Sequence, residues 1–123
     1  MHPFRAAIER GDEDAAMALL AADVRFRSPA VHRAYEGREA VEELLRLVVT
    51  VFEDFRYTDE LTDGDRTVLF FSASVGDRQL EGIDDITLGP DGTIADFRVM
   101  IRPLSGLIAL AEAMGARLGT AGG

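Results

Sequence analysis

Apolar side chains recur at helical spacing near the start of the chain. Phe4 and Ile8 lie one turn apart, after a proline that suits a first helical position. A Gly-Asp pair ending in Asp12 is typical of a helix stop joined to the N-cap of the next helix. The pattern therefore predicts two short helices, at 3–10 and 13–21.

Two longer helices are predicted from the same periodicity. The first begins after Gly37, with a charged row on one face and, on the other, Val41, Leu44, Leu45, Val48 and Phe52. The second begins at Leu104 and ends near Gly119, and a small-residue tail at 120–123 is expected to fray. No linker divides the chain, so residues 1–119 are expected to form a single domain.

Period-two alternation predicts the remaining elements. "DVRFRSPAV" indicates a short strand that enters a loop at Pro29. Four more strand-like runs follow the long helix, separated by turn-rich connections: "FRYTDEL", "TVLFFSASV", "QLEGIDDITL" and "TIADFRVMI". Helices first and an antiparallel meander afterwards predict an α+β domain in which helices cover one face of a curved sheet.

The second face of that sheet is expected to be covered as well, because "TVLFFSASV" is apolar on both faces. A homodimer through the outer sheet face is the simplest cover. The expected outer face has an apolar centre with charged flanks, as at a dimer surface: Ile83, Ile94 and Met100 between Asp85, Asp96, Arg98 and Arg102.

The composition excludes several classes of chemistry. The chain has no cysteine and no lysine, which rules out disulfides, thiolate nucleophiles, Cys-bound zinc and Schiff-base amines. A net charge of −9, with the arginines scattered among carboxylates, disfavours nucleic acid as a partner. The start has no leader-like apolar segment and the longest apolar stretch is too short to span a bilayer, so a cytoplasmic protein without membrane contact is expected.

Two adjacent aspartates stand in the middle of the strand-like run "LEGIDDITL". Asp84 shares a strand face with apolar residues, whereas Asp85 falls on the other face and is expected to be solvated. If Leu88 pairs with Thr93 across the "GPDG" turn, Asp84 faces Phe97. A carboxyl group among apolar neighbours is biased toward its neutral form, which can donate a hydrogen bond to a ligand. The alternative is a buried aspartate satisfied by a backbone, hydroxyl or arginine partner.

The order of these motifs resembles a known superfamily. "GDEDAAMALLAADVRFRSPAVHRAYEGREAVEELL", followed by "GIDDITLGPDGTIADF", is similar to the nuclear transport factor 2-like superfamily, particularly its SnoaL-like branch. The resemblance covers nearly the whole chain. It implies a cone-shaped half-barrel, in which a curved, mainly antiparallel sheet and helices enclose an apolar pocket, commonly as a dimer joined through the sheet. Members include ketosteroid isomerases, polyketide cyclases, epoxide hydrolases, dehydratases and binding domains without chemistry, so the fold alone does not give the function.

The steroid isomerases' catalytic residues have only a partial match in this sequence. Their catalytic tyrosine corresponds to Phe4 and their general-base aspartate to Ser28, while their protonated hydrogen-bond donor corresponds to Asp84. Phe4 cannot donate a hydrogen bond and Ser28 is not basic near neutral pH, so isomerisation of that type is not expected. An arginine of the epoxide hydrolases corresponds to Gly82, which disfavours that activity too.

His32 is the second candidate for proton transfer, because it is the only interior histidine and titrates near neutral pH. It could pair with Asp84 across one pocket, although the sequence favours a surface-loop histidine beside Arg33. The sequence shows no metal-ligand spacing, and no cofactor is expected. The expected ligand-binding residues are aromatic, apolar or hydroxyl-bearing: Phe4, Phe26, Ser28, Tyr35, Phe52, Ile86, Phe97 and Val99.

Three functions stay open on this evidence. The first is a small-molecule-binding domain whose ligand is mostly hydrophobic and carries a carbonyl or hydroxyl group. The second is an isomerase, cyclase or dehydratase that transfers a proton next to a carbonyl in the same pocket, with Asp84 or His32 as base. The third is a purely structural dimer whose interior is filled by its own side chains.

Overall fold

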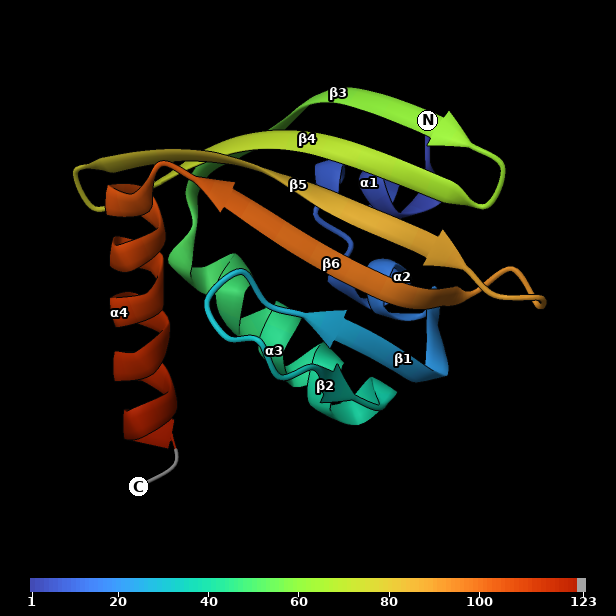
Figure 1. Cartoon of the computed structure of the whole chain (residues 1–123), viewed down its shortest axis with the longest axis horizontal. Helices are drawn as coiled ribbons and strands as arrows, with labels where there is room; N and C mark the ends of the chain where they lie inside the picture. The colour runs from blue at the N-terminus through green and yellow to red at the C-terminus, as the bar shows by residue number, and fades with distance from the viewer. Residues whose placement is uncertain (122–123) are drawn as a thin grey trace.

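The computed structural model describes residues 1–121, with side chains as far as Arg117. Within them, six strands form one sheet in the order β2-β1-β6-β5-β4-β3, with only β1 and β6 parallel (Figure 1). The strands are β1 (Leu20–Arg27), β2 (Tyr35–Glu36), β3 (Glu53–Asp63), β4 (Arg66–Val75), β5 (Arg78–Leu88) and β6 (Ile94–Arg102). The helices are α1 (Pro3–Glu9), α2 (Glu13–Met17), α3 (Arg38–Val51) and α4 (Leu104–Ala121).

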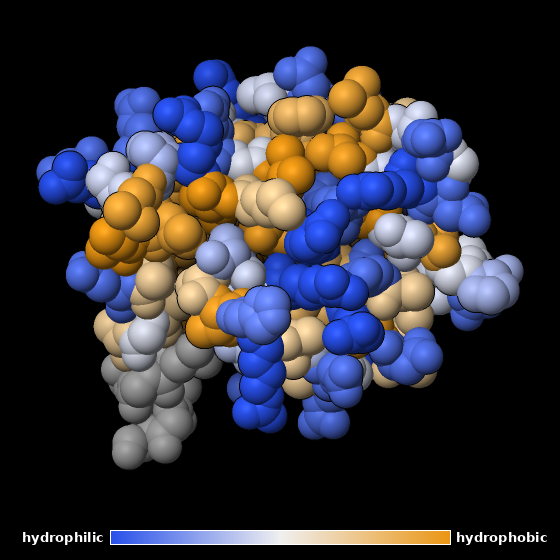
Figure 2. All heavy atoms as spheres, in the orientation of Figure 1, coloured by the Kyte–Doolittle hydropathy of each residue, from blue (hydrophilic) through white to orange (hydrophobic). Residues whose placement is uncertain are grey.

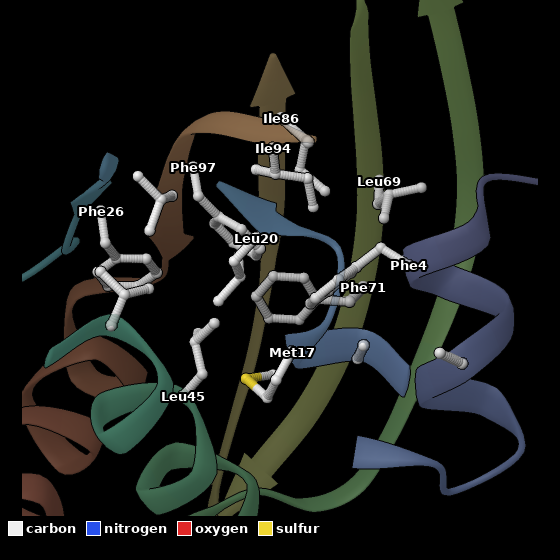
Figure 3. Packing of buried hydrophobic residues seen from close by; sticks show 14 of the residues in the cluster. Phe4, Met17, Leu20, Phe26, Leu45, Leu69, Phe71, Ile86, Ile94 and Phe97 are labelled. Carbon is white, nitrogen blue, oxygen red and sulfur yellow. The ribbon is translucent and has the colours of Figure 1, made fainter. Parts of the chain in front are cut away.

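The first three helices lie on the inner face of the curved sheet, which confirms the predicted α+β class. Figure 3 shows how each helix sends a buried side chain toward the strands: Phe4 from α1, Met17 from α2 and Leu45 from α3. These side chains meet strand residues that are almost completely excluded from water, among them Leu69, Ile86 and Phe97. Burial of this apolar layer is the main favourable contribution to folding. No helix in the described part of the chain has the length and hydropathy that a membrane span needs.

The second predicted helix is shorter than its sequence pattern indicates. The expected Asp12 N-cap is present, since its side chain accepts a hydrogen bond from the amide of Ala15. The helix nevertheless ends at Met17 instead of residue 21, because Leu20 pairs with Ile94 of β6 and the Ile94 amide donates to the carbonyl of Leu19. A long-range strand pairing therefore overrides the local helical pattern.

The register between β5 and β6 differs from the predicted one by two residues. Asp84 lies opposite Val99, and Phe97 lies opposite Ile86. An irregularity between Thr87 and Leu88 shifts the pairing, so that the two strands are connected by a longer turn than a simple "GPDG" hairpin would give. The same irregularity moves Ile94 from the predicted outer face into the core, where it is fully buried.

Helix α4 runs across the end of the sheet and contacts α3, β4, β5 and β6 (Figure 1). Gly106 permits this approach, because a Cβ atom there would lie 2.8 Å from both the Gln79 carbonyl and the Leu80 Cβ. The predicted tail at 120–123 stays a prediction, since residues 122 and 123 lie outside the described residues.

Candidate functional site

A cavity of about 520 Å³ lies between the inner face of the sheet and helices α1, α3 and α4. Nearly all of its wall is apolar. The described lining residues are Phe4, Ile8, Met17, Phe26, Ser28, Pro29, Ala30, Val31, Tyr35, Leu44, Leu45, Val48, Val49, Phe52, Phe55, Phe71, Asp84, Phe97, Val99, Ile101, Leu110, Ala111, Met114 and Gly115. A space of this size and character suits a small organic molecule.

Asp84 is the one ionisable carboxyl group among the described residues of this wall. It lies in the middle of β5, between Leu69 of β4 and Val99 of β6, and only 7% of its surface is exposed. The hydroxyl of Tyr57 donates a hydrogen bond of 3.0 Å to its Oδ2 atom. No described residue donates to Oδ1, so that oxygen keeps its hydrogen-bonding capacity for a molecule in the cavity.

Burial raises the pKa of Asp84 to about 7, and the hydrogen bond from Tyr57 opposes that rise. The pKa of Tyr57 is raised well above its ordinary value, first by burial and then by the neighbouring Asp84. Tyr57 therefore stays protonated and acts as a donor. Asp84 has appreciable populations of both its neutral and its charged form near neutral pH, so it can donate to a carbonyl oxygen or accept a proton.

Tyr57 is a site residue that our sequence interpretation missed. It pairs with Phe71 of β4 and packs edge-on against Phe55, with ring centroids 4.9 Å apart. A signal for it was present, because Phe55 and Tyr57 alternate with Arg56 and Thr58, which places both rings on the inner face. Its partnership with Asp84 was not accessible, since the two residues meet only across β4.

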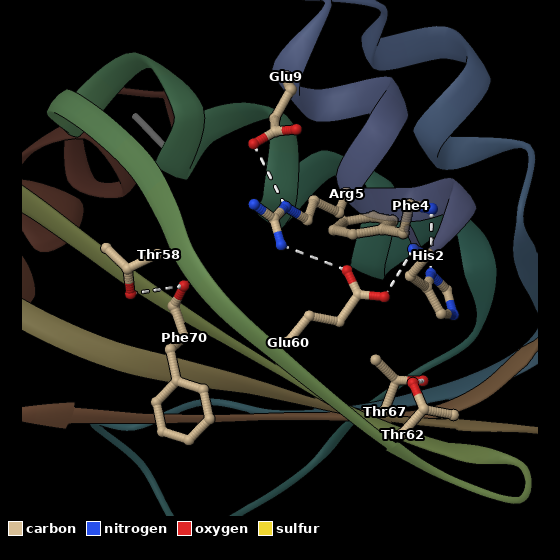
Figure 4. A network of polar contacts seen from close by, with 9 residues as sticks. All are labelled: His2, Phe4, Arg5, Glu9, Thr58, Glu60, Thr62, Thr67 and Phe70. Atoms are coloured by element: carbon tan, nitrogen blue, oxygen red, sulfur yellow. Dashed lines mark hydrogen bonds and ion pairs between the residues drawn. The ribbon is translucent and has the colours of Figure 1, made fainter.

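A polar network fixes the position of α1, and with it Phe4, over the sheet. Glu60 of β3 accepts hydrogen bonds from the backbone amide of His2 at 2.8 Å and from the Arg5 guanidinium at 3.4 Å (Figure 4). The imidazole Nδ1 of His2 also accepts from the amide of Phe4, which caps the helix. Partial burial lowers the pKa of His2, and this favours the neutral ring that the cap requires.

The structure brings most of the predicted ligand-binding residues together around the cavity. Seven of the eight line it: Phe4, Phe26, Ser28, Tyr35, Phe52, Phe97 and Val99. The exception is Ile86, which is completely buried in the core and does not line the space. Ser28 lies at the start of the loop after β1, where its Oγ accepts a hydrogen bond from the amide of Ala30.

His32 is not brought together with Asp84. It is exposed in the loop between β1 and β2 and lines a different hollow, together with Arg25, Arg27 and Arg98. The cavity wall therefore offers Asp84 no histidine partner among the described residues.

Asp85 is not solvated, contrary to the sequence-based expectation. Only 5% of its surface is exposed, because two arginines lie over it on the outer face. Arg66 donates two hydrogen bonds, at 2.9 and 2.7 Å, and Arg98 donates a third at 2.8 Å. The hydrogen bonds from Arg66 and Arg98 lower the pKa of Asp85 despite its burial.

Gly82 is required by the packing of the cavity wall. A Cβ atom at this position would lie 2.7 Å from the ring of Phe71 and 2.5 Å from the carbonyl oxygen of Met100. An arginine here, as in the epoxide hydrolases, would displace the Phe71 ring.

The fold and sequence together identify the family. The model of the SnoaL-like domain family matches residues 2–101, and the chain belongs to this family. Its sheet and helices have the nuclear transport factor 2-like arrangement found in its structural neighbours. Among curated proteins, none matches the chain.

Solved structures support the same assignment. A steroid delta-isomerase from Pseudomonas aeruginosa is 50% identical, with a TM-score of 0.88 over 94% of this chain and 85% of that one. An uncharacterised bacterial protein with a cystatin-like fold from Silicibacter pomeroyi is 40% identical, with a TM-score of 0.89 over 98% of this chain and 88% of that one. An NTF2-like protein of unknown function from Mesorhizobium loti is 18% identical, with a TM-score of 0.71 over 81% and 85% of the two chains, and shows the fold alone.

Proposed function

We propose that this protein binds a mostly hydrophobic small molecule that carries a carbonyl or hydroxyl group. The observation that supports this most is the presence of one buried, partly neutral carboxyl group in an otherwise apolar cavity of about 520 Å³. The apolar wall would take up the body of the ligand, and the cost of burying Asp84 would be offset when its free oxygen pairs with the ligand's polar group.

The orientation of the ligand follows from the two oxygens of Asp84. Oδ2 is occupied by the Tyr57 hydroxyl, so the ligand would meet Oδ1. A neutral Asp84 would donate from Oδ1 to a carbonyl oxygen, while an ionised Asp84 would accept from a hydroxyl group. Carbonyl ligands are therefore expected to bind more tightly below pH 7 and hydroxyl ligands above it.

A second candidate function is isomerisation by proton transfer next to a carbonyl, in the same cavity. The pKa of Asp84, about 7, suits a general acid or base at neutral pH, and a protein 50% identical is named a steroid delta-isomerase. Ser28 occupies the position of the isomerases' general base and cannot perform that role. Asp84 would then have to serve as the base itself.

A ligand panel distinguishes a ligand-binding protein from a purely structural dimer that binds no ligand. Thermal unfolding would be measured with steroid, polyketide-like and aromatic compounds, each as a ketone and as the matching hydrocarbon. We expect the ketones to raise the melting temperature more than the hydrocarbons do, because a ligand that binds only the folded state stabilises it. If no compound raises the melting temperature of this protein, the binding proposal is wrong.

Replacing Asp84 separates binding from catalysis. Asp84→Asn keeps the shape and one hydrogen bond but removes acid and base function. Under the binding proposal, the affinity for a ketone changes by less than about tenfold. Under the isomerase alternative, turnover of a β,γ-unsaturated ketosteroid falls by at least about a hundredfold. Asp77→Asn, which makes the same substitution on the exposed β4–β5 hairpin outside the cavity, is the matched control.

A further inference from the structure

A second hollow, of about 500 Å³, lies where β1 ends beside β6. The two strands pair as far as Arg27 and Arg98, and no described strand pairs with this edge of β6 beyond that point. The loop after β1 passes along this open part of β6. We call the hollow the arginine groove; its described lining residues are Arg25, Arg27, Ser28, Pro29, Val31, His32, Ala34, Arg98, Val99, Met100 and Ile101.

The arginine groove gathers guanidinium groups in a protein that is strongly negative. The chain carries 22 acidic and 13 basic residues, yet none of the described residues lining the groove is acidic and three are arginine. Within this negative protein, guanidinium groups without acidic neighbours in the lining make the groove a more favourable place for an anion than the rest of the surface.

The arginines of the groove have N–H donors that no described residue pairs with. Arg25 has one ion pair, to Glu36 at 3.5 Å, and Arg27 has one, to Asp96 at 3.3 Å. The Nε–H of Arg27 is buried and has no partner among the described residues. Each guanidinium offers five N–H donors, so most of these donors are unused.

Two like charges lie side by side in the sheet at this point. Arg27 and Arg98 are direct neighbours in the register of β1 and β6. Like charges at facing positions destabilise a sheet unless counter-charge lies between or beside them. Asp96 pairs with Arg27, and Asp85 is shared between Arg98 and Arg66, so two carboxylates face three guanidinium groups and one positive charge is left over. An oxyanion in the groove would neutralise it.

The groove and the cavity adjoin each other. They share five lining residues: Ser28, Pro29, Val31, Val99 and Ile101. The loop segment 28–31 and the open part of β6 therefore have the cavity on one side and the arginines on the other. A ligand that extends past these shared residues would reach the groove.

We propose that the ligand is amphipathic, with an apolar body in the cavity and an anionic carboxylate, sulfonate or sulfate end in the arginine groove. This rests on the proposed binding function and specifies its ligand class. Arg25 and Arg27 hold the anion through charge-assisted hydrogen bonds, and the planar guanidinium geometry suits an oxyanion.

A matched pair of fluorescent probes tests this directly. 8-Anilinonaphthalene-1-sulfonate and N-phenyl-1-naphthylamine share one apolar body and differ by the sulfonate, and both brighten in an apolar site. We expect the sulfonate to bind at least about tenfold more tightly in roughly 20 mM salt, and this advantage to shrink at about 500 mM salt because exposed charges are screened.

Arginine variants test whether the groove causes the tighter binding of the sulfonate probe. Arg25→Gln and Arg27→Gln should each weaken binding of the sulfonate by about threefold to tenfold, because partly exposed ion pairs contribute modestly. Neither change should alter binding of the uncharged probe. Arg78→Gln is the matched control, since it removes an equal charge from the exposed β4–β5 hairpin outside the groove.

Each outcome decides between the two proposals. If the uncharged probe binds but the sulfonate has no advantage, or if Arg78→Gln reduces the advantage as much as Arg27→Gln does, the groove is not an anion site and the cavity proposal stands. If neither probe binds, both proposals are overturned. If Arg27→Gln changes the mass in solution without changing the probe ratio, the anion proposal is overturned and the groove is a contact between copies of this chain.

Discussion

Asp84 and Asp85 are consecutive residues of one strand, yet their surroundings give them opposite properties. Only 7% and 5% of their surfaces are exposed. Asp84 faces an apolar cavity with one neutral hydroxyl partner, and its pKa rises to about 7. Asp85 faces the outer side under two guanidinium groups, and its pKa falls. Burial alone therefore does not decide the charge of a carboxyl group; the partners that share the burial decide it.

Because the pKa values of Asp84 and Asp85 shift in opposite directions, the two residues change the stability of the fold with pH in opposite ways. The effect of Asp84 is expected to be the larger one. Its pKa is about 7 in the folded protein, against an ordinary value of 3.8 for a solvated aspartate side chain. Below pH 4 both the folded and the unfolded state hold the proton, whereas between pH 4 and 7 only the folded state does. Stability from this group is therefore lost as the pH rises, by on the order of 4 kcal/mol at pH 8.

Asp84→Asn should abolish this loss. Urea unfolding of the variant and the parent between pH 4 and 8 would give the difference in free energy of unfolding. We expect the variant to gain stability relative to the parent as the pH rises. Asp77→Asn, the same substitution on the exposed β4–β5 hairpin, is the control. A flat difference for Asp84→Asn would mean that its carboxyl group has an ordinary pKa.

Asp85→Asn should have the next largest effect, with the opposite sign at neutral pH. We expect a loss of about 1–3 kcal/mol in the free energy of unfolding, because three charge-assisted hydrogen bonds are weakened. Its lowered pKa means that this stabilisation is present above pH 4 and is lost on further acidification. Equal stability of variant and parent at pH 7 would show that solvent screening cancels the ion pairs.

Tyr57→Phe tests the surroundings of Asp84 by removing its hydrogen-bond partner. We expect a cost of about 1 kcal/mol from the lost hydrogen bond and a pKa of Asp84 above its present value, because Tyr57 stabilises the charged form. The carboxyl carbon chemical shift of Asp84, followed against pH, would measure this pKa. Phe55→Leu, which changes a neighbouring ring without removing a hydrogen bond, is the control. A lower pKa in Tyr57→Phe would contradict the assignment.

The smallest effect on monomer stability is expected on the outer face. Phe70, Ile83 and Met100 form an apolar row across β4, β5 and β6, and Met100 is 49% exposed. Figure 4 shows the Phe70 ring on the side of the sheet away from α1, and Figure 2 shows hydrophobic side chains on the surface beside a band of hydrophilic ones. The predicted homodimer would cover this row.

Met100→Lys, at the exposed residue of this row, tests the dimer. A charge in the row should reduce the mass measured by light scattering from two chains to one, because an unpaired charge in an interface is costly. Monomer stability should change by about 0.5 kcal/mol or less, as for a surface position. Asp63→Lys, at the exposed end of β3, is the control. A parent protein that is already monomeric would refute the dimer.

Local patterns were sufficient to predict most of the fold. The periodicity of α3, the Asp12 cap and the alternation of the meander each depend on near neighbours in the chain, so sequence spacing contains them. The family resemblance added the expectation of a half-barrel that encloses an apolar pocket. The errors occurred where distant segments compete: β1 displaced the end of α2, and the irregular β5–β6 turn changed the register.

The residues of the candidate site also differ in how far the sequence alone could place them. The face of Asp84 follows from strand alternation, because adjacent side chains point to opposite faces whatever the register. Its partner Tyr57 does not follow, since the two are joined only through β4. His32 could not be placed either, because a loop has no periodicity to orient its ring.

The sequence by itself determined the class of fold, the inward direction of Asp84 and the absence of thiol and lysine chemistry. These depend on backbone geometry and residue identity alone. Only the tertiary structure decided that Tyr57 pairs with Asp84, that Arg66 and Arg98 lower the pKa of Asp85, and where the arginines gather beside the cavity. The reason is that electrostatic energies depend on distances and burial between segments that the chain order does not bring together.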